Sequence, residues 1–347
     1  MAITRKPSVV EQIAADAGVS RAAAYAVLNP GKPSTIGVSA AKRKQILAAA
    51  KKVGYVRNDL ARSLVTGRTN TIGLCVQSLR DHFFTEFFTV FDDLASRAGK
   101  ATFFASGEFD ADREKRILNS FLAKRVDAMV VAGYNLAPMK ARLRRYVDSG
   151  GVILFLRSVL LEDQPEIAFD ETRAVSLQAE HLAALGHTRV AYVNASLARD
   201  MRVEMHRNRA LFFSKVWTRL TGHVPENLAG DNPVRVDDVL ADKVIEGRYT
   251  AVACANDTLA MSLISVLGQK GIRAPDDISV MGHDDVFLSR MFAPPLTTVR
   301  LPVAPLARES WRIIAEALGS DAESVRPERV VIRPELVVRL STAAPKE

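Results

Sequence analysis

Apolar residues follow a helical period near the start of the chain and form short continuous runs later. In residues 8–53 the apolar side chains recur every three or four positions, as they do on the buried face of a helix. From Thr71 onward, short apolar runs alternate with amphipathic stretches, which is typical of strands buried on both faces between helices. We therefore predict a small all-α region followed by a larger α/β body.

The first region has the start and stop signals of two short helices. Ser8 and Glu11 have the spacing of a capping box, and Gly18 supplies a stop that tolerates positive φ. Ser20 can cap a second helix over residues 21–28. A helix, a tight glycine-containing turn and a second helix form a helix-turn-helix, whose second helix enters the major groove of DNA.

A third helix is expected over residues 39–53 with Gly54 at its end, because two short helices cannot bury a core unaided. Its expected apolar face consists of Ile46, Leu47, Ala50 and Val53.

The later region alternates between strand and helix patterns. The apolar runs expected as strands are residues 72–76, 102–105, 128–132, 152–156, 190–193, 251–255 and 278–281. The stretches expected as helices are residues 83–98, 112–123, 139–147, 175–185, 204–220 and 259–268. This order predicts two similar halves with parallel, doubly wound sheets, and ligands of such sheets bind beyond the carboxyl ends of the strands.

Positive charge is concentrated at the start of the chain. Residues 1–70 contain twelve Lys and Arg against three Asp and Glu, whereas the whole chain has a net charge of +8. The rest of the chain is therefore close to neutral. A basic segment on a neutral body is typical of a protein that binds the phosphate backbone of DNA, and the alternative is a solvated lysine-rich helix.

Several segments of the chain resemble one known family, the lactose/galactose repressors. The similarity is carried by residues 13–20, 27–29, 38–39, 54–55, 58–64 and 71–74, and it continues through almost the whole chain. The resemblance implies a helix-turn-helix domain (1–57), a hinge helix and linker (58–70), and an effector-binding and dimerisation body (71–347). That body would have the periplasmic-binding-protein-like fold, with two doubly wound parallel-sheet subdomains.

The hinge is the first DNA-contacting segment that the resemblance implies. In the family it folds on DNA and pushes a leucine into the minor groove, which corresponds to Leu64 here. An apolar wedge of this kind unstacks a base step and bends the duplex. The matching contacts are Asn58, Ala61, Arg62 and Leu64. The alternative is that Leu64 only covers the junction between domains.

The expected recognition helix departs from the family pattern. Residues 23–26 read Ala-Ala-Tyr-Ala where relatives generally have Thr-Val-Ser-Arg, so the operator sequence of the family cannot be transferred. Arg21 and Tyr25 remain as long polar side chains, and Ala22 can meet a thymine methyl group. The remaining expected DNA contacts are Ser8, Ser20 and Asn29.

The expected effector site combines strand-end positions with family positions. Asn256, Asp284 and Asp170 each follow an apolar run, and the resemblance places all three with Arg207 in the pocket. The set is completed by Phe83, Phe84 and Arg157. For the two phenylalanines, packing in the core is the alternative. Amides, carboxylates and an arginine suit a polyol or a carboxylate, so a sugar or a sugar acid is expected.

The sequence has no pattern for catalysis, a metal or a cofactor, so none is expected. Its six histidines lack metal-site spacing, and Cys75 and Cys254 sit in apolar runs, as buried hydrophobic residues do. No stretch has the apolar length needed to cross a bilayer, and residues 1–7 lack the apolar core of a signal peptide. We therefore expect a cytoplasmic protein with no membrane partner.

The predicted function is a transcriptional regulator, most simply a repressor. A homodimer would bind a near-palindromic operator on double-stranded DNA, because two heads read two half-sites. A small-molecule effector in the body would change the affinity for DNA in one direction or the other. The alternatives are a solute-binding protein and an enzyme on the same α/β fold.

Overall fold

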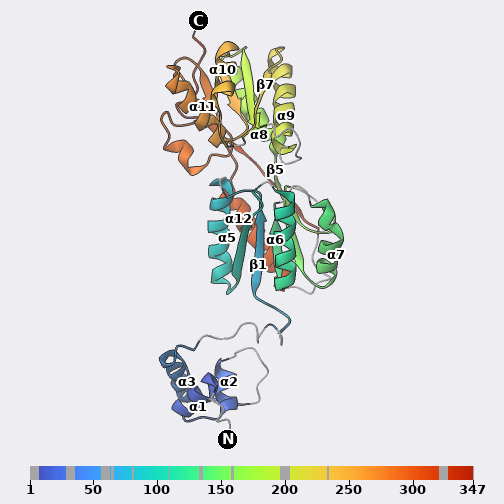
Figure 1. The fold of residues 1–347 in the computed structure, drawn as a ribbon, viewed down its shortest axis with the longest axis vertical. Helices are drawn as coiled ribbons and strands as arrows, with labels where there is room; N and C mark the ends of the chain where they lie inside the picture. Colours follow the sequence, from blue (N-terminus) through green and yellow to red (C-terminus); the bar gives the residue numbers. More distant parts are fainter. Residues whose placement is uncertain are drawn as a thin grey trace. The chain divides into compact units, whose positions relative to one another are not determined.

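The chain divides by its contacts into two compact units, Met1–Thr69 and Asn70–Glu347 (Figure 1). The computed structural model describes residues 8–28, 36–55, 63, 66–79, 82–108, 110–132, 136–157, 160–195, 204–232, 234–319 and 327–346, with the backbone alone at 195 and 204–207. We call the first unit the head and the second unit the body. The finer division of the first unit at residue 57 stays a prediction.

The described residues of the head include three helices, α1 (Val9–Asp16), α2 (Arg21–Leu28) and α3 (Ala40–Lys52). The predicted capping box is confirmed, since the Ser8 hydroxyl accepts from the Glu11 amide and the Glu11 carboxylate accepts from the Ser8 amide. The Ala23 amide donates to the Ser20 hydroxyl, which caps α2. Gly18 adopts the expected positive φ of 58° in the turn between the helices.

The buried face of α3 differs from the predicted one at Leu47. Leu47 is 50% exposed, whereas Ile46, Ala49 and Ala50 are buried against α1 and α2. At about 100° per residue, positions 46, 49 and 50 lie within one stripe of the helix that is about 100° wide, and Leu47 lies outside this stripe. Among the described residues of the head, nine apolar residues form the buried core, which is a small number for a folded unit.

The body contains two parallel sheets and a two-stranded ribbon. The first sheet has the order β11-β5-β4-β3-β1-β2, the second has the order β7-β6-β8-β9, and β10 pairs with β12 in an antiparallel ribbon. The strands are β1 (Thr71–Val76), β2 (Ala101–Ser106), β3 (Ala128–Val131), β4 (Val152–Leu156), β5 (Glu166–Phe169), β6 (Val190–Ala195), β7 (Glu226–Gly230), β8 (Ala251–Cys254), β9 (Ser279–Met281), β10 (Thr298–Arg300), β11 (Arg329–Ile332) and β12 (Glu335–Val337).

Helices connect most successive strands of the parallel sheets, whereas the parallel neighbours β4 and β5 are joined by residues 157–165. The connecting helices are α5 (His82–Arg97), α6 (Ala111–Lys124), α7 (Lys140–Asp148), α8 (Glu171–Ala184), α9 (Glu204–Thr221), α10 (Asp238–Glu246), α11 (Asp257–Gln269) and α12 (Val303–Gly319), with short 3-10 turns η1 (Ala137–Met139) and η3 (Phe287–Arg290). The predicted fold class, a helical head with an α/β body of two parallel sheets, is confirmed.

The last part of the chain returns to the first sheet. After β10 the chain forms α12, which packs against α5, where Phe91 and Trp311 meet edge to face at 5.8 Å. It then adds β11 beside β5 before β12 pairs with β10. The first sheet therefore contains a strand from a distant part of the sequence. The carboxyl ends of strands in both sheets carry the candidate effector site.

Candidate DNA-binding surface and effector site

The solvent-facing side of α2 presents a small and mixed set of side chains. Arg21 and Ala22 are exposed and Tyr25 is 41% exposed, whereas Ala24, Val27 and Leu28 are buried in the head core. The three residues predicted to read bases therefore lie on the accessible face of one helix. A guanidinium, a methyl group and a phenol on such a face can contact guanine, thymine and phosphate respectively.

Arg21 is held in place by α1. Its Nη1 donates to Glu11 Oε1 at 2.9 Å, while the other carboxylate oxygen of Glu11 accepts from the Ser8 amide at 2.7 Å. Glu11 is thus fixed on one side by the capping box and fixes Arg21 on the other. The Ser8 and Ser20 hydroxyls both accept from backbone amides, so their predicted DNA contact would use the hydroxyl hydrogen.

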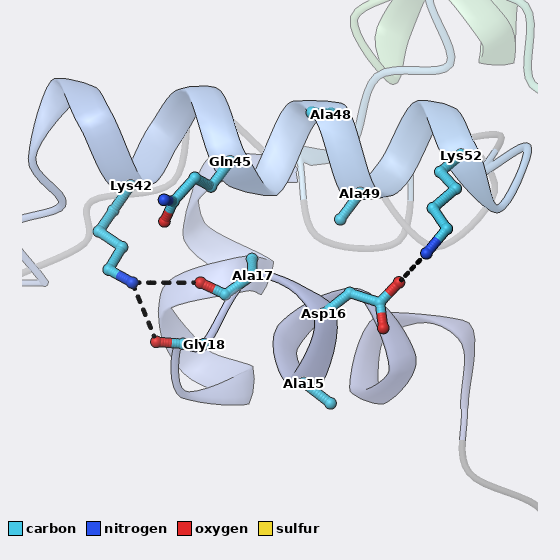
Figure 2. A pocket seen from close by; sticks show the side chains of 9 residues that line it. All are labelled: Ala15, Asp16, Ala17, Gly18, Lys42, Gln45, Ala48, Ala49 and Lys52. Carbon is cyan, nitrogen blue, oxygen red and sulfur yellow. Dashed lines mark hydrogen bonds and ion pairs between the residues drawn. The ribbon is translucent and has the colours of Figure 1, made fainter.

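Side chains of helix α3 contact the end of α1 and the turn that follows it (Figure 2). The Lys42 ammonium donates to the carbonyl oxygens of Ala17 at 3.3 Å and Gly18 at 3.4 Å. At the other end of the shallow groove between the helices, Lys52 pairs with Asp16 at 3.4 Å. A cation at the negative end of α1 is favourable, and the Lys42 contacts hold the turn that carries α2.

The other predicted DNA contacts lie outside the described residues. This applies to Asn29, Asn58, Ala61, Arg62 and Leu64, so their roles stay predictions.

The candidate effector site is built around a buried arginine that the sequence analysis did not select. Arg209 on α9 has a side chain that is 2% exposed, and it donates from Nε and Nη2 to both carboxylate oxygens of Glu171, at 2.8 and 3.2 Å. Its Nη1 donates to the Ala255 carbonyl at 2.6 Å, and its Nη2 lies 3.6 Å from Asp284 Oδ1. His283 Nε2 is 3.9 Å from Glu171.

These charges strongly stabilise one another. Burial alone would raise the pKa of Glu171, but Arg209 and Arg157 together lower the pKa to about 2, so Glu171 is ionised at neutral pH. Burial opposes the charge on Arg209, and yet Glu171 and Asp284 raise the pKa of its guanidinium. The site is thus a largely buried ion network, in which removing one partner leaves another charge without compensation.

Arg157 joins this network from the end of β4. Its guanidinium lies over the rings of Phe83 at 4.6 Å and Phe169 at 5.3 Å, in cation–π geometry. Phe83 and Phe84 are each 2% exposed and pack edge to face at 5.2 Å. This burial supports the alternative that Phe83 and Phe84 pack in the core and do not contact a ligand. The guanidinium of Arg157 lies against one face of the Phe83 ring.

Two other predicted effector residues cap helices. Asp170 Oδ1 accepts from the Arg173 amide at the start of α8, and Asn256 Oδ1 accepts from the Leu259 amide at the start of α11. Both follow strands, as the strand-end rule requires, and both have a structural role that competes with ligand binding. The backbone of Arg207 belongs to α9, but its side chain lies outside the described part of the chain.

Asp257 fixes the loop that carries Asp284. Its fully buried carboxylate accepts from the Val286 amide at 2.8 Å and from the Thr298 hydroxyl. Burial, together with the nearby Asp284, raises the pKa of Asp257 well above its usual value. A side chain at Gly282 would meet Asp257 Oδ1 at 2.1 Å, so the close approach of this loop requires glycine.

The sequence carries signals for both Arg209 and Glu171. Arg209 lies four residues before Phe213 and eight before Trp217, and these two rings stack at 5.8 Å in the core. An arginine on the buried stripe of a helix needs a buried acid. Glu171, next to Asp170 at a strand end, was a candidate for that acid.

Among the residues that the structure describes, no group of three or more His, Cys, Asp or Glu side chains could hold a metal ion. Within the same residues, no helix has the length and apolar character needed to span a membrane.

The known proteins that are similar to this chain agree with one another in fold and in the kind of protein they are. Residues 179–342 match the periplasmic binding protein-like domain family. The chain is 32% identical to the HTH-type transcriptional regulator reg1 of Streptomyces lividans, over 96% of both chains. It is 29% identical to the HTH-type transcriptional repressor PurR of Mannheimia succiniciproducens, over 96% of this chain and 98% of that protein. The lac repressor dimer bound to operator and the anti-inducer ONPF is similar in structure, with a TM-score of 0.78, 25% identity and coverage of 98% of this chain and 100% of that one.

Proposed function

The chain belongs to the lactose/galactose-repressor family of HTH-type transcriptional regulators, and from this premise we propose that it represses transcription by binding an operator as a homodimer under the control of a small-molecule effector. This family consists of regulators rather than enzymes, so the enzyme alternative is set aside. The site of action would be DNA in the cytoplasm.

The observation that carries the proposal is the exposed face of α2 on a basic head. Arg21, Ala22 and Tyr25 are accessible on a helix whose turn is held by Lys42. The exposed cations of α3 supply positive charge for phosphates. The lac repressor neighbour, which is a dimer on its operator, supports a paired arrangement of two heads.

A gel-shift titration tests the proposal. The purified full-length protein is titrated against the DNA upstream of its own gene and against a shuffled duplex, at about 50, 100 and 200 mM salt. We expect a complex on the upstream DNA that is tighter than on the shuffled DNA and that weakens steeply with salt. If neither duplex gives a salt-sensitive complex, the proposal is wrong.

Two further measurements complete the test. Sedimentation velocity is expected to give the mass of a dimer. A thermal-shift screen of sugars, sugar acids and nucleobases is expected to find a ligand that raises the melting temperature, because a ligand that binds only the folded state stabilises it. Adding that ligand to the gel shift then shows whether it releases or tightens the DNA complex.

A further inference from the structure

We propose that Glu171 serves as a built-in carboxylate ligand of Arg209 and so restricts the effector to uncharged molecules. The inference rests on the proposed function, because it specifies the chemical class of the effector. It narrows the expectation of a sugar or a sugar acid to an uncharged polyhydroxylated compound.

The geometry of the pair is the first argument. Glu171 accepts from Nε and Nη2 of Arg209 with its two oxygens, at 2.8 and 3.2 Å. Two parallel bonds of this kind are how an arginine binds the carboxylate of a ligand. The remaining terminal nitrogen, Nη1, donates to the Ala255 carbonyl. The edge of Arg209 that a sugar acid would use is therefore already occupied.

Burial indicates how a ligand would meet the pair. The Arg209 side chain is 2% exposed, whereas the Glu171 side chain is 24% exposed. Solvent thus reaches this ion pair at Glu171 and not at Arg209. An incoming molecule would first meet a carboxylate whose pKa of about 2 keeps it ionised at every physiological pH.

The balance of charge is the second argument. In the described part of the cluster, the cations Arg157 and Arg209 are matched by the anions Glu171 and Asp284. A ligand carboxylate would add a third negative charge in a largely buried place, where the two arginines of the cluster already face anionic partners. Hydroxyl groups both donate and accept, so an uncharged polyol can bind beside the pair without disturbing this balance.

Removal of Glu171 tests the proposal by chemical rescue. We compare E171A with E180A, a matched control on the same helix, where Glu180 binds Arg173 through both oxygens at 2.8 and 2.9 Å but both side chains are more than 40% exposed. Melting temperatures of the full-length wild type and both variants are measured in sodium formate and in sodium chloride at equal concentration. Formate is the probe because it is a carboxylate small enough to occupy the vacated place.

The expected result is specific to E171A. Its melting temperature should fall by about 5–10 °C in chloride, because Arg209 is left buried without its main partner. Formate should restore a large part of this loss, whereas wild type and E180A should respond to the two salts alike. If E171A folds and formate does no more than chloride, the proposal is overturned.

A second variant covers the case in which E171A does not fold. E171Q keeps an oxygen that accepts from Arg209 but removes the negative charge, so formate should stabilise it more than chloride does. D-glucuronate should also bind E171Q about tenfold more tightly than it binds wild type, in calorimetry. If wild type binds D-glucuronate as tightly as E171Q does, the proposal is overturned. If neither protein binds D-glucuronate, the stabilisation of E171Q by formate relative to chloride decides. These readouts need no DNA, so their failure leaves the regulator proposal standing, and a failed gel shift leaves them unaffected.

Discussion

The head and the body use charge in opposite ways. In the part of the head that the structure describes, the ion pairs are exposed, as in Arg21 with Glu11, whose side chains are 63% and 36% exposed. In the body, the central pair of Arg209 and Glu171 is largely buried, with side chains that are 2% and 24% exposed. Exposed pairs exchange partners at small cost, whereas buried pairs are costly to break.

This difference matches what each unit has to recognise. A head that binds DNA must present cations that can leave their internal partners for phosphates and bases. A body that binds a small molecule needs fixed groups whose positions do not depend on the ligand. The four substitutions below test this contrast, from the largest expected effect to the smallest.

Arg209→Met should destabilise the body most. It leaves the buried Asp284 and the partly exposed Glu171 without Arg209, and loss of one partner of a buried ion pair typically costs about 3–5 kcal/mol. Urea unfolding measured by tryptophan fluorescence reports the body alone, because Trp217 and Trp311 are the only tryptophans in the chain. Arg173→Met, at an exposed pair, is the control and should cost less than about 1 kcal/mol. Similar losses in both variants would contradict the contrast.

Ile46→Ala should unfold the head without affecting the body. Ile46 is fully buried, and such a truncation costs about 2–5 kcal/mol. The small head core has little stability to lose, so DNA binding should disappear while the tryptophan transition of the body stays unchanged. Leu47→Ala removes a neighbouring, half-exposed side chain and should bind DNA like wild type. Loss of DNA binding in both variants would show that the head core is assigned wrongly.

Arg21→Ala should weaken operator binding by about 1–3 kcal/mol, as loss of a bidentate base contact does. The affinity of the variant for random DNA should fall much less. Competition gel shifts measure the affinities for operator and for random DNA in one experiment. Lys44→Ala, on the exposed surface of α3, is the control and should weaken both complexes equally. An equal loss on both DNAs for Arg21→Ala would make Arg21 a phosphate contact.

Glu11→Gln should have the smallest effect on stability. Glutamine can also serve in a capping box, and the exposed pair with Arg21 contributes less than about 1 kcal/mol. Random DNA should bind slightly more tightly because one negative charge is removed, while preference for the operator should fall because Arg21 is no longer held. In the double variant with Arg21→Ala, no further loss of preference is expected. An additional loss would show that Glu11 contributes to selectivity independently of Arg21.

Local features of the fold could be predicted from the sequence. The capping box at Ser8, the positive φ of Gly18 and the cap at Ser20 each depend on residues within a few positions, and all three are confirmed. The central strands were also predicted because they are apolar on both faces. Strand β7 was missed because its sequence, Glu-Asn-Leu-Ala-Gly, has one buried residue and no apolar run.

The candidate effector site was only partly predictable, because its bonds join distant residues. Asp284 and Arg157 follow strands and were selected, but Arg209, the cation that pairs with Asp284, lies on a helix. Its bond to Glu171 spans 38 positions in the sequence, and no local rule pairs them. Leu47 illustrates the same limit, because which of two adjacent apolar residues is buried depends on the neighbouring helices.

The return of the chain to its first sheet determines when that sheet can be completed. Strand β5, at Glu166–Phe169, obtains its outer neighbour only from Arg329–Ile332, close to the end of the chain. During synthesis from the N-terminus, β5 therefore emerges long before β11, and its hydrogen-bonding edge stays available to other chains. Nascent molecules should thus be most prone to misassociation before their last residues are made, and a protein shortened before residue 329 would keep that open edge permanently.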